Sequence, residues 1–124
     1  MLLDLNLAGK LTLVDGDNKQ IIPGITVYTG SRHTYNSQFA VINTGSGNPA
    51  AGKVLLASDN IWIYYSLDHM MPPSKGGTFD DAAFVKSMQR MKTLVSDPKY
   101  IIPGHDGQIF TRFPTVADGI VQIK

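Results

Sequence analysis

Two of the three histidines and one aspartate each follow a short run of apolar residues that favours a β-strand. They are His33 after residues 25–29, Asp59 after residues 54–57 and His105 after residues 100–102. Imidazole nitrogens and carboxylate oxygens are suitable ligands for zinc, and a carboxylate can bridge two cations. Because rigid strands commonly carry functional groups on the loops at their ends, these three residues form a candidate metal site. The alternative is that they are ordinary polar loop residues, since three scattered positions define no spacing rule.

The remaining polar candidates each have a functional and a structural interpretation. Asp106 follows His105 and could orient an imidazole as a hydrogen-bond acceptor, or it could form the turn before Gly107. Arg32 could attract an anionic substrate or be a solvated surface side chain. We expect His69 to be exposed in a loop.

Glycine and proline divide the chain into short apolar segments that favour β-strands. They predict strands over residues 11–14, 20–22, 25–29, 38–43, 53–57, 100–102 and 119–123. The first two should pair as a hairpin around Asp15–Asn18, because Asp-Gly and Asn tolerate positive φ. Residues 44–52, rich in Gly, Ser and Asn, should form an exposed loop in an antiparallel meander that runs from residue 11 to residue 57.

One amphipathic helix is expected in the second half of the chain. Its apolar positions, at helical spacing, are Phe84, Met88, Met91 and Val95. Thr78 is a plausible N-cap, and the helix should span residues 79–96, ending before Pro98 because the residue before proline disfavours the α conformation. We expect its apolar stripe to be core rather than a set of ligands.

Composition predicts one conventional domain over residues 1–124. The chain is 43% hydrophobic and 17% charged with a net charge of +1, and so lacks the basic patch typical of nucleic-acid and anionic-membrane binders. It has no cysteine, which excludes disulfides, thiolate zinc sites and cysteine nucleophiles. The apolar runs are far shorter than the roughly 18 residues that span a bilayer, and no secretion signal is evident. We therefore expect a cytoplasmic chain without nucleic-acid or membrane partners.

Several motifs occur in an order typical of one known superfamily. They are Leu13–Asp17, Ile22–Val27, Gly30–Gln38, Val54–Asp59, Ile102–Asp106 and Phe110–Pro114. In this order they resemble the metallo-β-lactamase superfamily, and most nearly its branch of N-acyl-homoserine-lactonase-type hydrolases. The resemblance covers residues 9–123.

The resemblance implies a fold, a cofactor and a reaction. The fold class would be α/β in the broad sense (α+β): half of a four-layer αββα sandwich, with a mostly antiparallel or mixed sheet covered on one face by the long helix. His33 would complete a first zinc site, Asp59 would bridge two zinc ions, and His105 would bind the second. Metal-bound hydroxide would attack an ester, lactone or amide carbonyl of a small-molecule substrate. Asp59 and Asp106 would be the catalytic residues.

The same resemblance implies that ligands are missing from this sequence. The family carries His-x-His-x-Asp-His in the first half of its domain, and no such motif occurs here. We therefore expect the C-terminal half of a metallo-β-lactamase domain, with weak zinc binding and no activity alone. Because one sheet face of a half-domain would lie open, we also expect a homodimer or a complex with an N-terminal half.

Two positions depart from the family pattern. Tyr35-Asn36 stand where the family usually has Pro-Gly, and Trp62 stands where lactonase-like members have a tyrosine that contacts the substrate carbonyl. Tyr64 and Tyr65 are near but out of register. The missing motif and Trp62 keep one alternative open, a non-catalytic fragment or assembly subunit that retains only the fold. A small binding domain with a chance resemblance is a further alternative, which would gain if His33, Asp59 and His105 were far apart.

Overall fold

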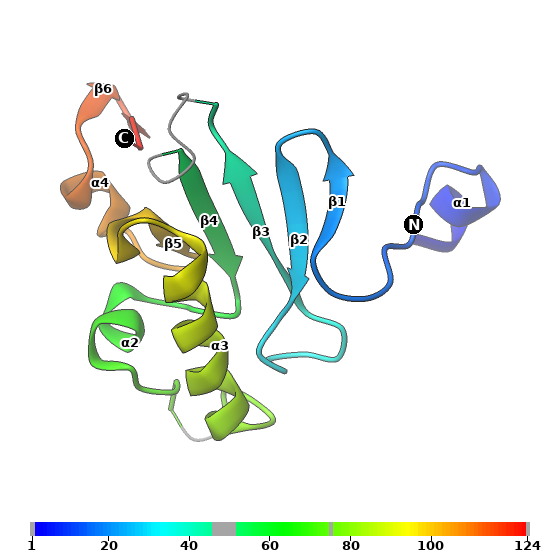
Figure 1. Ribbon diagram of the computed structural model, residues 1–124, viewed down its shortest axis with the longest axis horizontal. Helices are drawn as coiled ribbons and strands as arrows, with labels where there is room; N and C mark the ends of the chain where they lie inside the picture. The colour runs from blue at the N-terminus through cyan, green and yellow to red at the C-terminus, as the bar shows by residue number, and fades with distance from the viewer. Residues whose placement is uncertain (1, 46–51, 75, 124) are drawn as a thin grey trace.

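A computed structural model describes residues 2–45, 52–74 and 76–123, and it contains one five-stranded sheet. Its strands are β1 (Lys19–Ile22), β2 (Ile25–Thr29), β3 (Gln38–Asn43), β4 (Lys53–Ser58) and β5 (Ile101–Pro103). They lie side by side in chain order (Figure 1). Successive strands from β1 to β4 are antiparallel, whereas β5 runs parallel to β4 after a long crossover.

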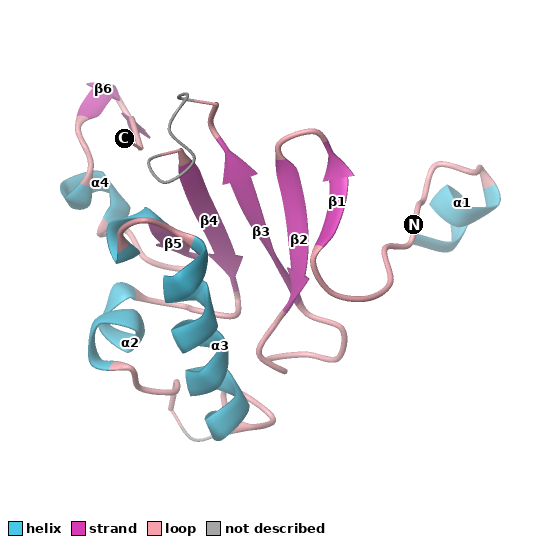
Figure 2. Ribbon diagram, viewed as in Figure 1, coloured by secondary structure: helices cyan, strands magenta, loops and turns pink. Residues whose placement is uncertain are grey.

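Two helices, α2 (Tyr64–His69) and α3 (Asp81–Leu94), pack against one face of this sheet on its β4–β5 side. The other helical elements of the described residues are α1 (Leu2–Leu7), a 3₁₀ turn (Pro98–Tyr100) and α4 (Ile109–Arg112). Figure 2 shows α3 crossing in front of β5 with α2 beside it, and α1 apart from the sheet, beyond β1. A separate two-stranded sheet pairs β6 (Thr115–Ala117) with β7 (Ile120–Val121). This arrangement confirms the expected α+β fold class.

The core lies between one face of the sheet and the two helices α2 and α3. Alternation along the strands sends Phe39 and Val41 of β3, and Leu55 of β4, toward the helices. From α3, Phe84 and Met88 fill the other side with no exposed surface. The helical stripe is therefore core, as its spacing indicates.

The opposite face of the sheet is also apolar but only partly covered. Leu56 on β4 keeps 40% of its surface exposed and Ile22 on β1 keeps 55%. Between them, Val27, Ile42 and Val54 are half-buried. Apolar side chains on both faces are typical of a sheet that packs on two sides, as the resemblance implies.

Most predicted strands are confirmed, but the first hairpin is wrong. Strands 25–29 and 38–43 match β2 and β3, and strand 53–57 is β4 with one more residue. Residues 11–14 form no strand, because β1 pairs instead with β2 across the turn at Gly24, whose φ is +84°. The loop predicted over 44–52 lies mostly outside the described residues.

The long helix begins later than expected. Asp80, not Thr78, is the N-cap, because its carboxylate accepts a hydrogen bond from the Ala83 backbone N–H at 2.9 Å. The Thr78 hydroxyl instead donates to the Arg32 carbonyl oxygen. The helix ends at Leu94, two residues short of the predicted end. The predicted strands 100–102 and 119–123 correspond to β5 and to the shorter β7.

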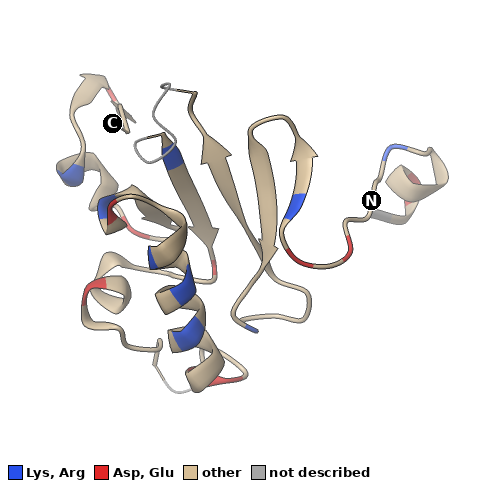
Figure 3. Cartoon of the chain, viewed as in Figure 1, with Lys and Arg blue, Asp and Glu red and all other residues tan. Residues whose placement is uncertain are grey.

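The segment ahead of β1 is held by an ion pair rather than by strand pairing. Figure 3 shows basic residues along α3 and acidic residues in the loop ahead of β1. Arg90 and Asp17 join these two segments with two hydrogen bonds of 3.1 and 2.6 Å, and Asp17 also accepts from the Thr29 N–H. Chiefly because of Arg90, the pKa of Asp17 is lowered from 3.8 to about 2.

The lowered pKa of Asp17 predicts a specific acid sensitivity. A carboxylate with a lowered folded-state pKa stabilises the fold above pH 3.8, and this contribution is lost as the pH falls toward about 2. We expect Asp17→Asn to flatten the pH dependence of the free energy of unfolding in this window, measured by urea denaturation. Arg90→Gln should have the same effect without adding to it. An acid limb identical to that of wild type in Asp17→Asn would contradict the role of this pair.

Candidate metal centre

The topology of the sheet brings the three predicted ligands to one edge. Both β2 and β4 are antiparallel to β3, and β5 is parallel to β4, so β2, β4 and β5 all run in one direction. His33, Asp59 and His105 each lie in the loop after the carboxyl end of one of these strands. Figure 1 shows the arrowheads of β2 and β4 at the same end of the sheet.

The Asp59 carboxylate lies between the two imidazoles. Its Oδ1 is 2.5 Å from Nε2 of His105, and its Oδ2 is 3.9 Å from Nε2 of His33. The exposed fractions of the side chains are 19% for His33, 46% for Asp59 and 62% for His105, so the cluster is open on the His105 side. The expected convergence of the three side chains is therefore present, with each imidazole facing a different carboxylate oxygen.

The orientation of the His33 ring suits a cation ligand. Its Nδ1 is 2.9 Å from the Gly77 carbonyl oxygen, which can only accept a hydrogen bond, so Nδ1 carries a proton. A neutral imidazole then presents the lone pair of Nε2 toward Asp59, and two acceptors face each other. Such a pair is stabilised by a proton or a metal cation between them. Histidines that bind metals usually donate their other ring N–H in this way.

The cluster is a partial ligand set and not a formed cage. Within the three described ranges, no group of three or more His, Cys, Asp or Glu side chains could hold a metal ion. The two Nε2 atoms face different oxygens of the Asp59 carboxylate, so the two imidazoles do not point at a single position that one metal ion could occupy. The donor chemistry fits zinc, but a zinc ion held here would need further ligands.

Trp62 lies between the two histidines. Its ring meets His33 edge-on at a centroid distance of 5.3 Å and His105 at 6.1 Å. Its Nε1 is buried and has no hydrogen-bond partner among the described residues. Of the nearby tyrosines, Tyr64 is buried, and Tyr65 stacks on His69 at 4.0 Å. His69 is exposed as predicted, but it is the last residue of helix α2 rather than a loop residue.

The loop that carries His105 packs directly on the backbone that carries Asp59. A Cβ on Gly104 would lie 2.8 Å from the backbone carbonyl carbon and oxygen of Ser58. The Gly104 N–H donates to the Ile61 carbonyl oxygen, and the His105 N–H donates to that of Trp62. Ser58 itself adopts a left-handed conformation with φ of 50°, which turns the chain sharply at the end of β4.

Asp106 makes two backbone contacts. Its Oδ2 accepts from the Tyr64 N–H at 2.7 Å, at the start of α2, and its Oδ1 accepts from the Gln108 N–H at 2.9 Å. Neither of these bonds goes to an imidazole, and the second is the turn contact expected from the position of Asp106 before Gly107. Whether Asp106 also orients a histidine stays a prediction.

Arg32 is exposed with φ of 60°.

Sequence reasoning overlooked Asn60, which is 1% exposed and ties the loop of His33 to the loop of Asp59. Its Oδ1 lies 2.7 Å from the Ser31 backbone nitrogen and 3.0 Å from Oγ of Ser37. The available signal is a polar residue directly after a candidate ligand, between the apolar segments 54–57 and 61–64.

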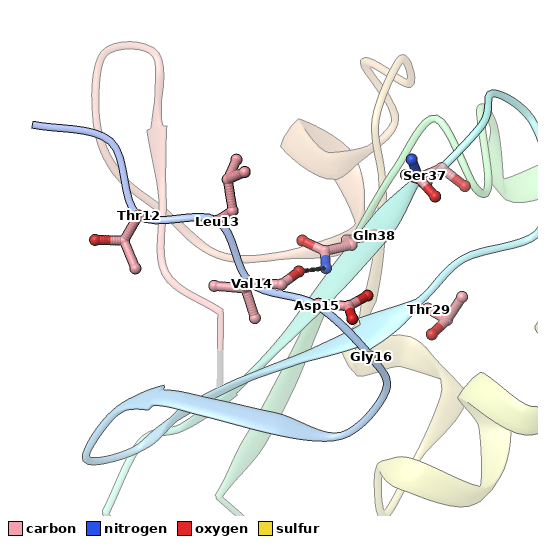
Figure 4. Close-up of a pocket in the computed structure, with 9 residues that line it drawn as sticks. Thr12, Leu13, Val14, Asp15, Gly16, Thr29, Ser37 and Gln38 are labelled. Carbon is pink, nitrogen blue, oxygen red and sulfur yellow. Dashed lines mark hydrogen bonds between the residues drawn. The ribbon is translucent and has the colours of Figure 1, made fainter. Parts of the chain in front are cut away.

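A cavity of about 660 Å³ lies beside this site rather than in it. Figure 4 shows it between the extended segment ahead of β1 and the start of β3, where Gln38 donates to the Val14 carbonyl oxygen at 3.2 Å. Its described lining comprises Thr12–Gly16, Thr29 and Asn36–Gln38, and none of the three candidate ligands contributes to it.

Comparison with solved structures identifies lactone hydrolases as structural neighbours. One is an N-acyl homoserine lactone hydrolase with N-hexanoyl-L-homoserine bound at its catalytic metal centre (24% identity, TM-score 0.66). Another is a variant of AiiA from B. thuringiensis with N-decanoyl-L-homoserine at its active site (24% identity, TM-score 0.66). In each case the match covers 85% of this chain and 39% of the neighbour.

At this level of identity the likeness shows the fold. It confirms the resemblance to N-acyl-homoserine-lactonase structures and is consistent with half of a metallo-β-lactamase sandwich. The chain spans about two fifths of the length of these neighbours. No family model and no curated protein matches the sequence.

The contact between Gly104 and Ser58 predicts that a methyl group is not tolerated at this glycine. We expect Gly104→Ala to lower the free energy of unfolding by about 1–3 kcal/mol, the usual cost of overpacking, because backbone atoms cannot move aside as a flexible side chain can. Gly107→Ala is the matched control, since a Cβ there would meet nothing within 4 Å. Urea denaturation of both variants is the measurement. Equal stability of the two variants would contradict the predicted clash.

Proposed function

We propose that this chain contributes half of the active site of a metal-dependent hydrolase of the metallo-β-lactamase type, acting on a small ester, lactone or amide. One observation carries the proposal: the Asp59 carboxylate lies between His33 and His105, with one oxygen toward each ring. A carboxylate that bridges two cations requires this disposition, in which each cation also has its own imidazole.

The residues divide into two half-sites under this proposal. His33 and Oδ2 of Asp59 would hold one zinc ion, and His105 and Oδ1 would hold the other. Two bound divalent cations lower the pKa of water and polarise a carbonyl, which is the chemistry needed for hydrolysis. The Gly77 carbonyl keeps the His33 proton on Nδ1, and this leaves Nε2 available as a ligand.

Two neighbouring residues shape the site. Asp106 holds the start of α2 and the turn after His105 through backbone N–H groups, so we propose that it positions His105 through the main chain. Trp62 packs edge-on against both imidazoles and limits their rotation. An indole cannot replace a phenol hydroxyl, so a carbonyl contact of the kind made by tyrosine in lactonase-like members has to come from elsewhere.

The remaining zinc ligands have to come from another segment or another chain. The His-x-His-x-Asp-His motif does not occur in these 124 residues. The half-covered sheet face with Ile22 and Leu56 is the surface on which a second sheet would pack. We propose that a second copy or an N-terminal half covers it. One structural neighbour holds its product N-hexanoyl-L-homoserine and another holds N-decanoyl-L-homoserine, which favours a lactone or a related ester as substrate.

The proposed ligands predict a ranked loss of zinc affinity. The isolated chain should bind zinc weakly, because zinc sites usually have three or four protein ligands around one ion. His33→Ala and His105→Ala should each lose at least about tenfold in affinity, since even outer partners of ligands cause such losses. Asp59→Ala should lose more, because it serves both half-sites. Competition with a chromogenic chelator measures the affinities.

His69→Ala is the matched control for zinc binding. It replaces the third histidine, which stacks on Tyr65, and should keep the wild-type affinity. Zinc that survives dialysis of the isolated chain against a chelator would refute weak binding. Tight zinc binding after addition of a segment that carries the missing motif, but without hydrolysis of lactones, esters or amides, would instead support a non-catalytic assembly subunit.

The open sheet face predicts self-association. We expect sedimentation equilibrium at micromolar concentration to give twice the chain mass of 13.5 kDa, because a two-fold dimer is the commonest way to cover such a face. Leu56→Lys should shift the equilibrium toward the monomer, since Leu56 is 40% exposed on that face. Leu13→Lys is the control, because Leu13 is 81% exposed ahead of β1. A stable wild-type monomer that binds no hydrophobic dye would rule this interface out.

A further inference from the structure

We infer that Asn60 is a positioning residue that sets the placement of His33 relative to Asp59, an inference that deepens the proposed function and rests on it. Asn60 directly follows Asp59 and is almost completely buried, with 1% of its surface exposed. A buried carboxamide is costly unless all its polar atoms are paired. The partners that it has are therefore informative.

The carbonyl oxygen of Asn60 holds both ends of the loop that carries His33. Its Oδ1 accepts from the Ser31 backbone N–H at 2.7 Å and from the Ser31 hydroxyl at 3.1 Å. It also accepts from the Ser37 hydroxyl at 3.0 Å. Because Ser31 and Ser37 lie on either side of His33, one atom fixes the base of the whole loop.

The amide nitrogen of Asn60 holds β3, which follows this loop, and β4, which precedes Asp59. Its Nδ2 donates to the Gln38 carbonyl oxygen at 3.0 Å, at the start of β3, and to the Ala57 carbonyl oxygen at 3.0 Å, near the end of β4. Every hydrogen-bonding group of the side chain is thus in use. Only a carboxamide offers one acceptor and two donors in this geometry, so aspartate would place an oxygen against two carbonyl oxygens.

The loop is packed onto Asn60 without room for a side chain at its first residue. A Cβ on Gly30 would lie 2.0 Å from Oδ1 of Asn60. The Gly30 N–H also donates to the Ser37 carbonyl oxygen at 2.7 Å, which closes the base of the loop. His33 is therefore carried on a loop whose base is fixed, and Gly77 holds its ring from the other side.

The consequence for the site follows from the chain neighbours of Asn60. The residue that fixes the His33 loop is adjacent to Asp59, so the two ligands share one anchor. The 3.9 Å distance between Nε2 of His33 and Oδ2 of Asp59 depends on this anchor. His105 does not, because its loop is tied to Ile61 and Trp62. The inference predicts that a defect at Asn60 displaces His33 and leaves His105 in place.

The test compares Asn60→Asp and the milder Ser37→Ala with a core variant, Val95→Ala, which destabilises the chain away from the site. Two readouts are used on the full 124-residue chain. The first is zinc affinity by chelator competition. The second, in the metal-free chain, is the nuclear Overhauser effect between the rings of Trp62 and His33, with the Trp62–His105 pair as an internal reference.

Asn60→Asp should lower zinc affinity by about tenfold or more and abolish the Trp62–His33 effect while the Trp62–His105 effect persists. Ser37→Ala should show the same pattern to a smaller degree, and it decides the matter if Asn60→Asp does not fold. Val95→Ala should change neither readout. Unchanged ring contacts in both site variants would overturn the positioning role, whatever the zinc result.

Failure of the proposed function has a different signature. If the wild-type chain binds no zinc, alone or with a segment that carries the missing motif, the metal centre is wrong. The ring contacts of His33 in Asn60→Asp then still decide whether Asn60 positions it. If zinc binds and neither site variant weakens it, the metal centre stands and the role of Asn60 at that centre is refuted.

Discussion

The edge of the sheet depends on backbone approaches that a Cβ atom would prevent. Gly30 lies against the buried amide of Asn60, and Gly104 lies against the backbone of Ser58. The first contact draws in the loop after β2 and the second draws in the loop after β5, both toward the end of β4. Two imidazoles and one carboxylate that are far apart in sequence meet because these two glycines leave room for close packing.

The charge arrangement at this edge follows from that packing. Asp59 faces two imidazoles, and the carbonyl of Gly77 determines which nitrogen of His33 carries its proton. The ligand set is incomplete on one side and one face of the sheet is incompletely covered. Both features fit the proposal that a second sheet packs on this face and completes the site.

Regular elements were predictable because their signals are local. The strands at 25–29 and 38–43 and the core stripe of α3 follow from period and turn residues alone. The first predicted hairpin is wrong because β1 pairs with β2, and the loop ahead of β1 is held instead by Arg90 and Asp17, which are far apart in sequence. Thr78 was mistaken for the cap because its hydroxyl is used by the Arg32 loop. The three candidate ligands came from strand ends, whereas Asn60 was missed because its role exists only once two loops meet.

The parallel pairing of β4 with β5 determines when the site can form. β5 begins more than forty residues after β4 ends, with α2 and α3 in between. The entropic cost of closing such a connection is incurred before its contacts are gained, so pairings distant in sequence form slowly. The antiparallel strands can associate while the chain is still short, but His105 reaches Asp59 only after the crossover is complete. During synthesis and refolding, we therefore expect the edge that carries Asp59 and His105 to be the last part of the sheet to acquire its native geometry.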